Sequence, residues 1–270
     1  MKLKLIVIIV LCALMAASCR NRRETARKEL DKLGVEFTDQ SFLERIRKGD
    51  VILVGMFLSA GMDPNVRFTK NNDSNATDEL NNSTPLMIAA REGHIKLVRM
   101  FLAKKGDVNA RADNGQTALM YAARYASREL AADLIAAGAG INAKDADGKT
   151  ALTFAVLLDR ANIVDILLEN GADPNVKDRF QFNPLMQAAI KGKPDILKAL
   201  LKKGADKTVL TPDGKTILML ASEYGRASAV RLLLGEGINT KARDNSGNTA
   251  AQIAENKGHP DIAALIRTGR

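Results

Sequence analysis

Apolar and polar positions along the chain repeat with a period of 33 residues. Each copy opens with a threonine or asparagine followed by a short, mainly apolar run. The six copies begin at Thr84, Thr117, Thr150, Asn183, Thr216 and Thr249. No insertion or deletion breaks the spacing between Thr84 and Ala254. A unit of about 33 residues cannot bury its own apolar face, so this fixed period predicts stacked units that cover one another.

Each unit is predicted to contain two short helices. In the copy that begins at Thr150, the threonine side chain is expected to cap a first helix formed by the run 151–156. A second helix carries the apolar stripe 163–168 and ends before Gly171, because glycine accepts the left-handed conformation that closes many helices. Pro184 falls at a first helical position, where its missing N–H costs nothing. The pattern therefore predicts an all-α array.

The recurring motifs resemble those of the ankyrin repeat family. The family's Thr-Pro-Leu-His-x-Ala motif is matched best at Thr84–Ala89, and a Gly-His pair follows at Gly93-His94. The family's loop Gly-Ala-Asp-x-Asn is complete at Gly171–Asn175. The resemblance implies an all-α repeat solenoid of about seven units. Each unit would be a helix-turn-helix with a β-hairpin loop.

The resemblance also sets the predicted domain boundaries. An ankyrin repeat domain is expected over residues 39–267. It would consist of a degenerate first repeat at 39–65, a polar insertion at 66–82 and six repeats at 83–267. The insertion is rich in Asn, Asp, Ser and Thr, which is typical of a polar loop.

The N-terminus predicts an exported protein. Lys2 and Lys4 precede the apolar run 5–17, which is shorter than the roughly 17–25 residues of a spanning helix, so residues 1–18 are predicted to be a signal peptide. Small residues before Cys19 resemble the cleavage box of bacterial lipoproteins. That resemblance implies lipidation of Cys19 and a membrane-anchored lipoprotein in the periplasm or on the cell surface. Secretion after ordinary cleavage and a retained N-terminal anchor remain alternatives.

Residues 19–38 are rich in charge and offer little that could enter a core, so a partly helical tether between the lipid and the domain is predicted. The two cysteines, Cys12 and Cys19, lie in and at the end of the signal, so the mature chain can form no internal disulfide. The formal net charge of +9 arises from basic residues interleaved with acidic ones. This pattern favours a solvated surface over a nucleic-acid partner. Attraction to anionic headgroups below a lipid anchor is a further possibility.

Two short motifs suggest chemistry and are better explained as turns. Gly148-Lys149-Thr150 resembles the end of a phosphate-binding loop, but Ala143 stands where that loop needs a glycine. Asp145–Gly148 resembles the start of a calcium loop, but the twelfth position holds Val156 instead of a glutamate. A hairpin turn followed by a helix cap accounts for both.

The two histidines give no grounds for catalysis. His94 and His259 are separated by five repeats, which is about 40–50 Å at the usual spacing of packed helices. They cannot share a metal ion or a proton relay. The sequence therefore predicts no catalytic residue, no metal ligand, no cofactor and no enzymatic activity.

The family resemblance implies protein binding through a concave face formed by the hairpin tips and the ends of the first helices. The candidate contact residues at those positions are Arg124, Tyr125, Leu157, Leu158, Phe180, Phe182, Ile190, Lys191, Asp213, Glu223 and Tyr224. Phe180-Gln181-Phe182 puts two rings on a hairpin that elsewhere reads Asp-Gly or Asn-Gly. Exposed apolar groups of this kind mark interaction sites.

Three alternatives stay open at this point. The apolar residues in the middle of the array could simply extend the core, with one phenylalanine folded under its loop. The same groove could serve an exported enzyme or a receptor for a small ligand. The chain could also be a cytosolic regulator held by an uncleaved N-terminal anchor.

Overall fold

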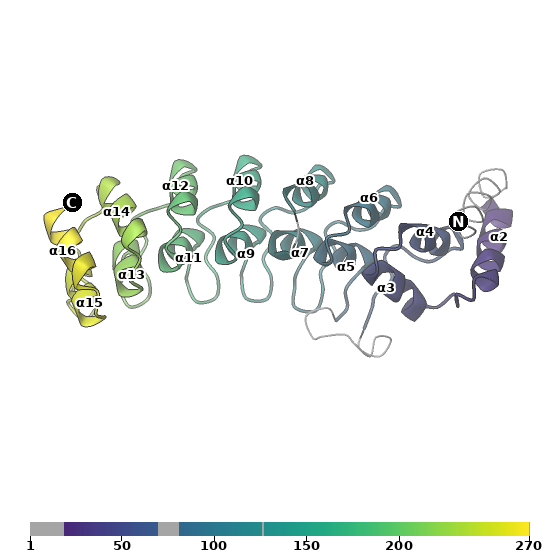
Figure 1. Ribbon diagram of the computed structural model, residues 1–270, viewed down its shortest axis with the longest axis horizontal. Coiled ribbons are helices and arrows are strands. Elements are labelled where there is room, and N and C mark those ends of the chain that lie inside the picture. The colour runs from purple at the N-terminus through teal and green to yellow at the C-terminus, as the bar shows by residue number, and fades with distance from the viewer. Residues whose placement is uncertain (1–18, 70–80, 126, 270) are drawn as a thin grey trace. The chain divides into compact units, whose positions relative to one another are not determined.

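The computed structural model describes residues 19–69, 81–125 and 127–269. These residues form fifteen helices, labelled α2 to α16 in Figure 1, and contain no β-strand. The chain divides into two compact units, Met1–Gly140 and Ile141–Arg270. The units are described separately below.

The described residues of the first unit form one N-terminal helix and three helix pairs. Its helices are α2 (Cys19–Lys32), α3 (Asp39–Arg47), α4 (Val51–Ser59), α5 (Pro85–Arg91), α6 (Ile95–Ala103), α7 (Ala118–Tyr125) and α8 (Arg128–Ala136). The first helices α3, α5 and α7 pack in one row, and the second helices α4, α6 and α8 pack in another. We number these pairs as repeats one to three.

The second unit contains four helix pairs, which are repeats four to seven. Its helices are α9 (Ala151–Leu157), α10 (Ala161–Glu169), α11 (Pro184–Lys191), α12 (Pro194–Lys202), α13 (Ile217–Glu223), α14 (Ala227–Gly235), α15 (Ala250–Asn256) and α16 (Pro260–Thr268). Each first helix packs on the first helix of the next repeat, and each second helix does the same, as Figure 1 shows. A loop precedes each first helix and carries the hairpin of that repeat.

The helix starts are those that the sequence predicts. The hydroxyl of Thr150 accepts a hydrogen bond from the N–H of Thr153 at 3.3 Å. Asn183 takes the same role in the fifth repeat, where its Oδ1 accepts from the N–H of Met186 at 2.9 Å. Each cap satisfies one of the N–H groups that a helix start leaves without a partner.

Close packing explains the repeated alanine in the first helices. Ala155, Ala188 and Ala221 occupy equivalent positions in repeats four to six, and none has any exposed surface. Each lies where the first helices of neighbouring repeats meet. A larger side chain there would overpack the interface, typically at a cost of about 1–3 kcal/mol.

The histidines of the Gly-His motifs join one repeat to the next. The Nε2 of His94 lies 3.0 Å from the carbonyl oxygen of Arg47, so its N–H donates to that carbonyl. The ring covers Gly49, where an added Cβ would lie 2.7 Å from the ring carbon Cε1. His259 covers Gly225 in the same way. Both histidines are therefore explained by packing.

The N-terminal helix differs from the predicted tether. Ala26 and Leu30 of α2 are completely buried, and the helix packs on α4. The guanidinium group of Arg27 donates to the carbonyl oxygen of Ala60 at 3.3 Å and lies 4.6 Å from the ring centroid of Phe37. The few apolar residues of this charged segment share one helix face, and this is enough to dock it as a cap on the first repeat.

Several sequence predictions fall outside the described residues. The signal peptide at 1–18 is one of them, as are residues 70–80 of the polar insertion. The side chain of Cys19 is not described either. The two ends of the insertion meet, because the N–H of Phe68 donates to the carbonyl of Ser83 at 2.9 Å.

Candidate protein-binding surface

The hairpin of the fifth repeat is organised by one buried carboxylate. Asp178 is only 4% exposed. Its Oδ1 accepts hydrogen bonds from the N–H groups of Phe180 and Phe182, both at 2.9 Å. Its own N–H donates to the carbonyl oxygen of Phe182, also at 2.9 Å. These bonds fix the path of the turn and leave the side chains at its tip free to vary.

The other hairpins of the second unit use the same frame. Asp145 and Asp244 each accept two backbone N–H bonds at 2.8–3.0 Å in the fourth and seventh repeats. In the sixth repeat, the hydroxyl of Thr211 replaces the carboxylate and accepts from the N–H of Lys215 at 2.9 Å. For Asp145 this is the turn chemistry that the sequence predicts.

The fifth hairpin keeps this turn although a glutamine stands at the left-handed position that glycine holds in other repeats. Gln181 has φ of 65°, whereas Gly148 and Gly214 hold the equivalent position at 77° and 78°. A left-handed conformation costs about 1–2 kcal/mol for a residue with a Cβ. The neighbouring Phe180 side chain is 55% exposed, and the guanidinium group of Arg179 lies 4.7 Å from its ring centroid. The fifth repeat therefore carries backbone strain together with an exposed ring.

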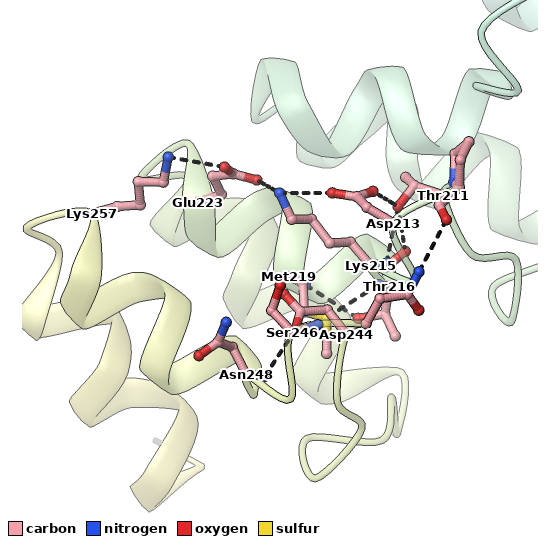
Figure 2. A network of polar contacts seen from close by, with 12 residues as sticks. Thr211, Asp213, Lys215, Thr216, Met219, Glu223, Asp244, Ser246, Asn248 and Lys257 are labelled. Atoms are coloured by element: carbon pink, nitrogen blue, oxygen red, sulfur yellow. Dashed lines mark hydrogen bonds and ion pairs between the residues drawn. The ribbon is translucent and has the colours of Figure 1, made fainter.

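In the sixth repeat, side chains from the hairpin and the first helix converge, as Figure 2 shows. The Nζ of Lys215 lies 3.1 Å from Asp213 Oδ2 and 2.8 Å from Glu223 Oε2. The Nζ of Lys257, from the next repeat, lies 3.1 Å from Glu223 Oε1. We call these four residues the Lys215 network. A cleft of about 250 Å³ lies beside it and is also lined by Asp244, Ser246 and Asn248 of the seventh hairpin.

The charges of this network stabilise one another. The hydrogen bond to Glu223, followed by that to Asp213, raises the pKa of Lys215 against the effect of burial. Burial favours a higher pKa for Glu223, but the hydrogen bonds from Lys215 and Lys257 outweigh it and hold that pKa below its ordinary value. The hydroxyl of Thr211, helped by Lys215, lowers the pKa of Asp213. These pKa shifts all favour the charged forms of Lys215, Glu223 and Asp213.

The three positions that converge in the sixth repeat can be compared across the array. They hold Asn114, Gln116 and Arg124 in the third repeat; Asp147, Lys149 and Leu157 in the fourth; Phe180, Phe182 and Ile190 in the fifth; Asp213, Lys215 and Glu223 in the sixth; and Ser246, Asn248 and Asn256 in the seventh. Repeats three, four, six and seven have at least two polar residues there. The fifth repeat has three apolar ones.

Further apolar side chains lie at the ends of the first helices. Leu158 and Tyr224 are 44% and 48% exposed, and Lys191 is exposed at the equivalent position between them. Leu157, Phe182 and Ile190 are half-buried. We define the Phe180 surface as Leu157, Leu158, Phe180, Phe182, Ile190, Lys191 and Tyr224. It comprises seven of the candidate residues named from the sequence, and Asp213 and Glu223 belong to the adjoining Lys215 network.

The remaining two candidates, Arg124 and Tyr125, lie in the first unit. The guanidinium groups of Arg124 and Arg91 lie 4.9 and 5.5 Å from the ring centroid of Tyr125. Both distances are within the range of cation–π interactions. Arg124 also donates to Gln116 Oε1 at 3.4 Å, which matches the Lys215–Glu223 pairing of the sixth repeat.

Comparison with protein families agrees with the fold. The family profile described as ankyrin repeats in three copies matches residues 49–145, 134–178 and 185–269. A second profile, described as ankyrin repeats in many copies, matches residues 158–201. The chain belongs to the ankyrin repeat family. The predicted all-α ankyrin repeat fold is thereby confirmed, and ankyrin repeats are generally protein–protein interaction modules without enzymatic activity.

No curated protein matches this ankyrin repeat chain. Among the residues that the structure describes, no three His, Cys, Asp or Glu side chains gather so that they could hold a metal ion. Within the same residues, every helix is too short or too polar to cross a membrane.

Two features of the ankyrin array were not predicted from the sequence. Leu210 is 51% exposed at a hairpin position that holds lysine or arginine in neighbouring repeats. The break in that basic column is visible in the sequence once the period is known. The second feature is the side-chain nitrogen of Asn183, which is buried and has no hydrogen-bond partner. Threonine, which caps the equivalent helices, carries no such group.

Proposed function

We propose that this ankyrin repeat protein binds a protein partner on the Phe180 surface. The observation that carries the proposal is the replacement of three converging polar positions by Phe180, Phe182 and Ile190 in one repeat only. The fifth hairpin also holds Gln181 in a strained conformation and leaves a buried amide nitrogen of Asn183 without a partner. Local rules broken without a gain in stability are expected at functional positions.

The exposed rings supply the energy of docking in this proposal. Burying a phenylalanine or leucine side chain contributes about 1.5–3 kcal/mol, and aromatic anchors dominate most interfaces. Phe180 is the principal anchor because it is the most exposed large apolar side chain of the described residues. Leu158 and Tyr224 flank it on the neighbouring repeats. The charged residues at the edge, Lys191, Asp213 and Glu223, contribute to specificity.

A double substitution tests this site. Phe180→Ala with Leu158→Ala is expected to abolish capture of the partner from native membranes while leaving the helical melting curve largely intact, because both side chains are about half exposed. Ile52→Ala is the matched control, since Ile52 is 44% exposed on α4 of the first unit. Proteins captured by the wild type and the control, but not by the double variant, would identify the partner. Identical capture by all three would refute the proposed site.

We further propose that the protein is exported and anchored through a lipid on Cys19. The apolar run 5–17 and the small residues before Cys19 support this proposal. Cys19→Ser is expected to move the protein from the membrane fraction to the soluble fraction. Blocking the lipoprotein signal peptidase should leave a longer precursor, whereas an unchanged band would favour an uncleaved anchor.

A further inference from the structure

The positive charge of the chain is concentrated in the fifth repeat. Residues 177–209 contain eight basic and three acidic side chains, an excess of five out of the net +9 of the whole sequence. The preceding 33 residues, 144–176, contain three basic and six acidic side chains. The same repeat that is most apolar at its hairpin is therefore also the most basic.

Little of this charge is neutralised within the protein. Arg179 pairs with Asp147 at 2.7 Å, and Lys193 pairs with Asp159. Lys191 is exposed and forms no ion pair with any described residue. Lys202, at the end of α12, is also exposed and unpaired among the described residues.

The repeat geometry explains why Lys191 lacks a partner. Its equivalent in the seventh repeat, Lys257, reaches back to Glu223 of the preceding repeat at 3.1 Å. The residue equivalent to Glu223 in the fourth repeat is Leu157. Lys191 therefore occupies a position from which a lysine can pair with a carboxylate, beside an apolar residue where that carboxylate is missing.

We propose that the partner presents an acidic segment to the Phe180 surface, with a carboxylate on Lys191 beside an aliphatic or aromatic anchor. This inference rests on the proposed function and adds the chemistry of the partner. The bound carboxylate takes the place that Glu223 has beside Lys257. The excess charge of the fifth repeat speeds association with an acidic partner through long-range attraction.

Nucleic acids and anionic membranes are also attracted by positive charge, but they fit this surface less well. A nucleic-acid site contacts a series of phosphates, whereas Lys191 is the single unpaired cation among the seven residues of the Phe180 surface. Ankyrin repeats generally bind proteins, and an acidic apolar protein segment satisfies both the rings and the lysine. Both alternatives become outcomes of the test.

The test uses synthetic peptides and the purified full chain. Every peptide carries the same leucine and phenylalanine residues at helical spacing, and the flanking residues are either Asp and Glu, Ser and Asn, or Lys and Arg. Fluorescence anisotropy at physiological salt should show the acidic set binding about tenfold more tightly than the basic set. Equal binding of the sets, tighter binding of the basic set or no binding at all would overturn the proposal.

Single substitutions then locate the charge. Lys191→Met keeps the apolar stem of the side chain. It should lower the affinity for the acidic peptides about fivefold, in line with the loss of one exposed ion pair. Lys202→Met removes the same charge from the second helix of that repeat and should have a much smaller effect. If Lys191→Met leaves acidic binding unchanged, Lys191 does not hold the carboxylate and the proposal fails.

The proposed function and this inference can fail separately. Peptide binding that needs Phe180 and Leu158 but shows no preference for acid would overturn the inference and keep the docking site. An acid preference that survives Phe180→Ala with Leu158→Ala would overturn the docking site. Binding to vesicles rich in phosphatidylserine or to a single-stranded oligonucleotide, lost on Phe180→Ala and without acidic-peptide binding, would replace the protein partner by a membrane or a nucleic acid.

Discussion

The hairpins of the fifth and sixth repeats share one backbone frame and carry opposite chemistry. In both, a buried side chain holds the turn, through Asp178 in one and Thr211 in the other. The tip of the sixth hairpin folds back through Lys215 onto Glu223 and is satisfied within the protein. The tip of the fifth presents Phe180 to solvent. The frame is thus independent of the tip, which leaves the tip residues free to serve binding.

The two hairpins also differ in how well they follow local preferences. The sixth uses Gly214 at its left-handed position and Thr216 as helix cap. The fifth uses Gln181 and Asn183 at the same places, and the amide nitrogen of Asn183 has no partner. Because the repeats are internal controls for one another, these differences are not explained by the fold. They favour selection for a function at the fifth hairpin.

Removing the side chain that holds each turn should give the largest change in the free energy of unfolding. Asp178→Ala leaves two part-buried N–H groups without their carboxylate acceptor and is expected to lower the free energy of unfolding by about 3 kcal/mol. Thr211→Ala removes one accepted backbone bond and the bond that the hydroxyl donates to Asp213, and it should cost less, about 1.5 kcal/mol. Urea unfolding followed by circular dichroism measures both. The exposed Asp165→Ala serves as the control and should change stability by less than about 0.5 kcal/mol. Equal costs for Asp178→Ala and Thr211→Ala would show that the two frames are equivalent.

Exchanging the residue types at the left-handed positions 181 and 214 should change the stability of the protein by intermediate amounts of opposite sign. Gln181→Gly removes a strained Cβ and is expected to stabilise the protein by about 1 kcal/mol. Gly214→Gln should destabilise it by about 2 kcal/mol, because an added Cβ would lie 2.4 Å from Asn245 Oδ1 and 3.0 Å from its backbone nitrogen. Thermal melting of both variants checks the signs. If Gln181→Gly leaves the melting temperature unchanged, the fifth turn is not strained.

The fold could be predicted largely from the sequence because each of its determinants is local and repeated. The 33-residue period, the Thr caps and the small alanines indicate which residues start, pack and end each helix. The docking of α2 on the first repeat is not predicted, because the net composition of this helix is charged. Ala26 and Leu30 are spaced four residues apart and so share one helix face, but two residues give only a weak pattern.

The candidate surface could be predicted only in part. Phe180 and Phe182 were identified because they replace the usual turn residues of a hairpin. That Lys215, Glu223 and Lys257 form one network depends on which positions converge, and they are separated by up to 42 positions in the sequence. The period alone does not show this convergence. Once one repeat shows it, the period identifies Phe182 and Ile190 as the equivalent positions of the fifth repeat.

Neutralising Glu223, the carboxylate of the Lys215 network on α13, should give the smallest change in stability. The pH dependence of this change tests whether the charge of Glu223 is the cause of the stabilisation. Glu223→Gln keeps the shape of the side chain and weakens its bonds to Lys215 and Lys257, at an expected cost of about 0.5–1 kcal/mol at pH 7. The folded-state pKa of Glu223 lies below its ordinary value of 4.5, so its stabilisation is present above that pH and is lost as the pH falls through the folded-state pKa.

The wild type and Glu223→Gln should therefore differ in urea midpoint at pH 7 and converge in acid, below the folded-state pKa of Glu223. Glu236→Gln is the control for a neutralised carboxylate in the same repeat, since Glu236 is exposed and its carboxylate has no partner among the described residues. This control should follow the wild type at both pH values. A difference between wild type and Glu223→Gln that persists unchanged in acid would mean that uncharged contacts of Glu223 stabilise the sixth hairpin. The contrast between a charged sixth hairpin and an apolar fifth would then not be one of electrostatic stabilisation.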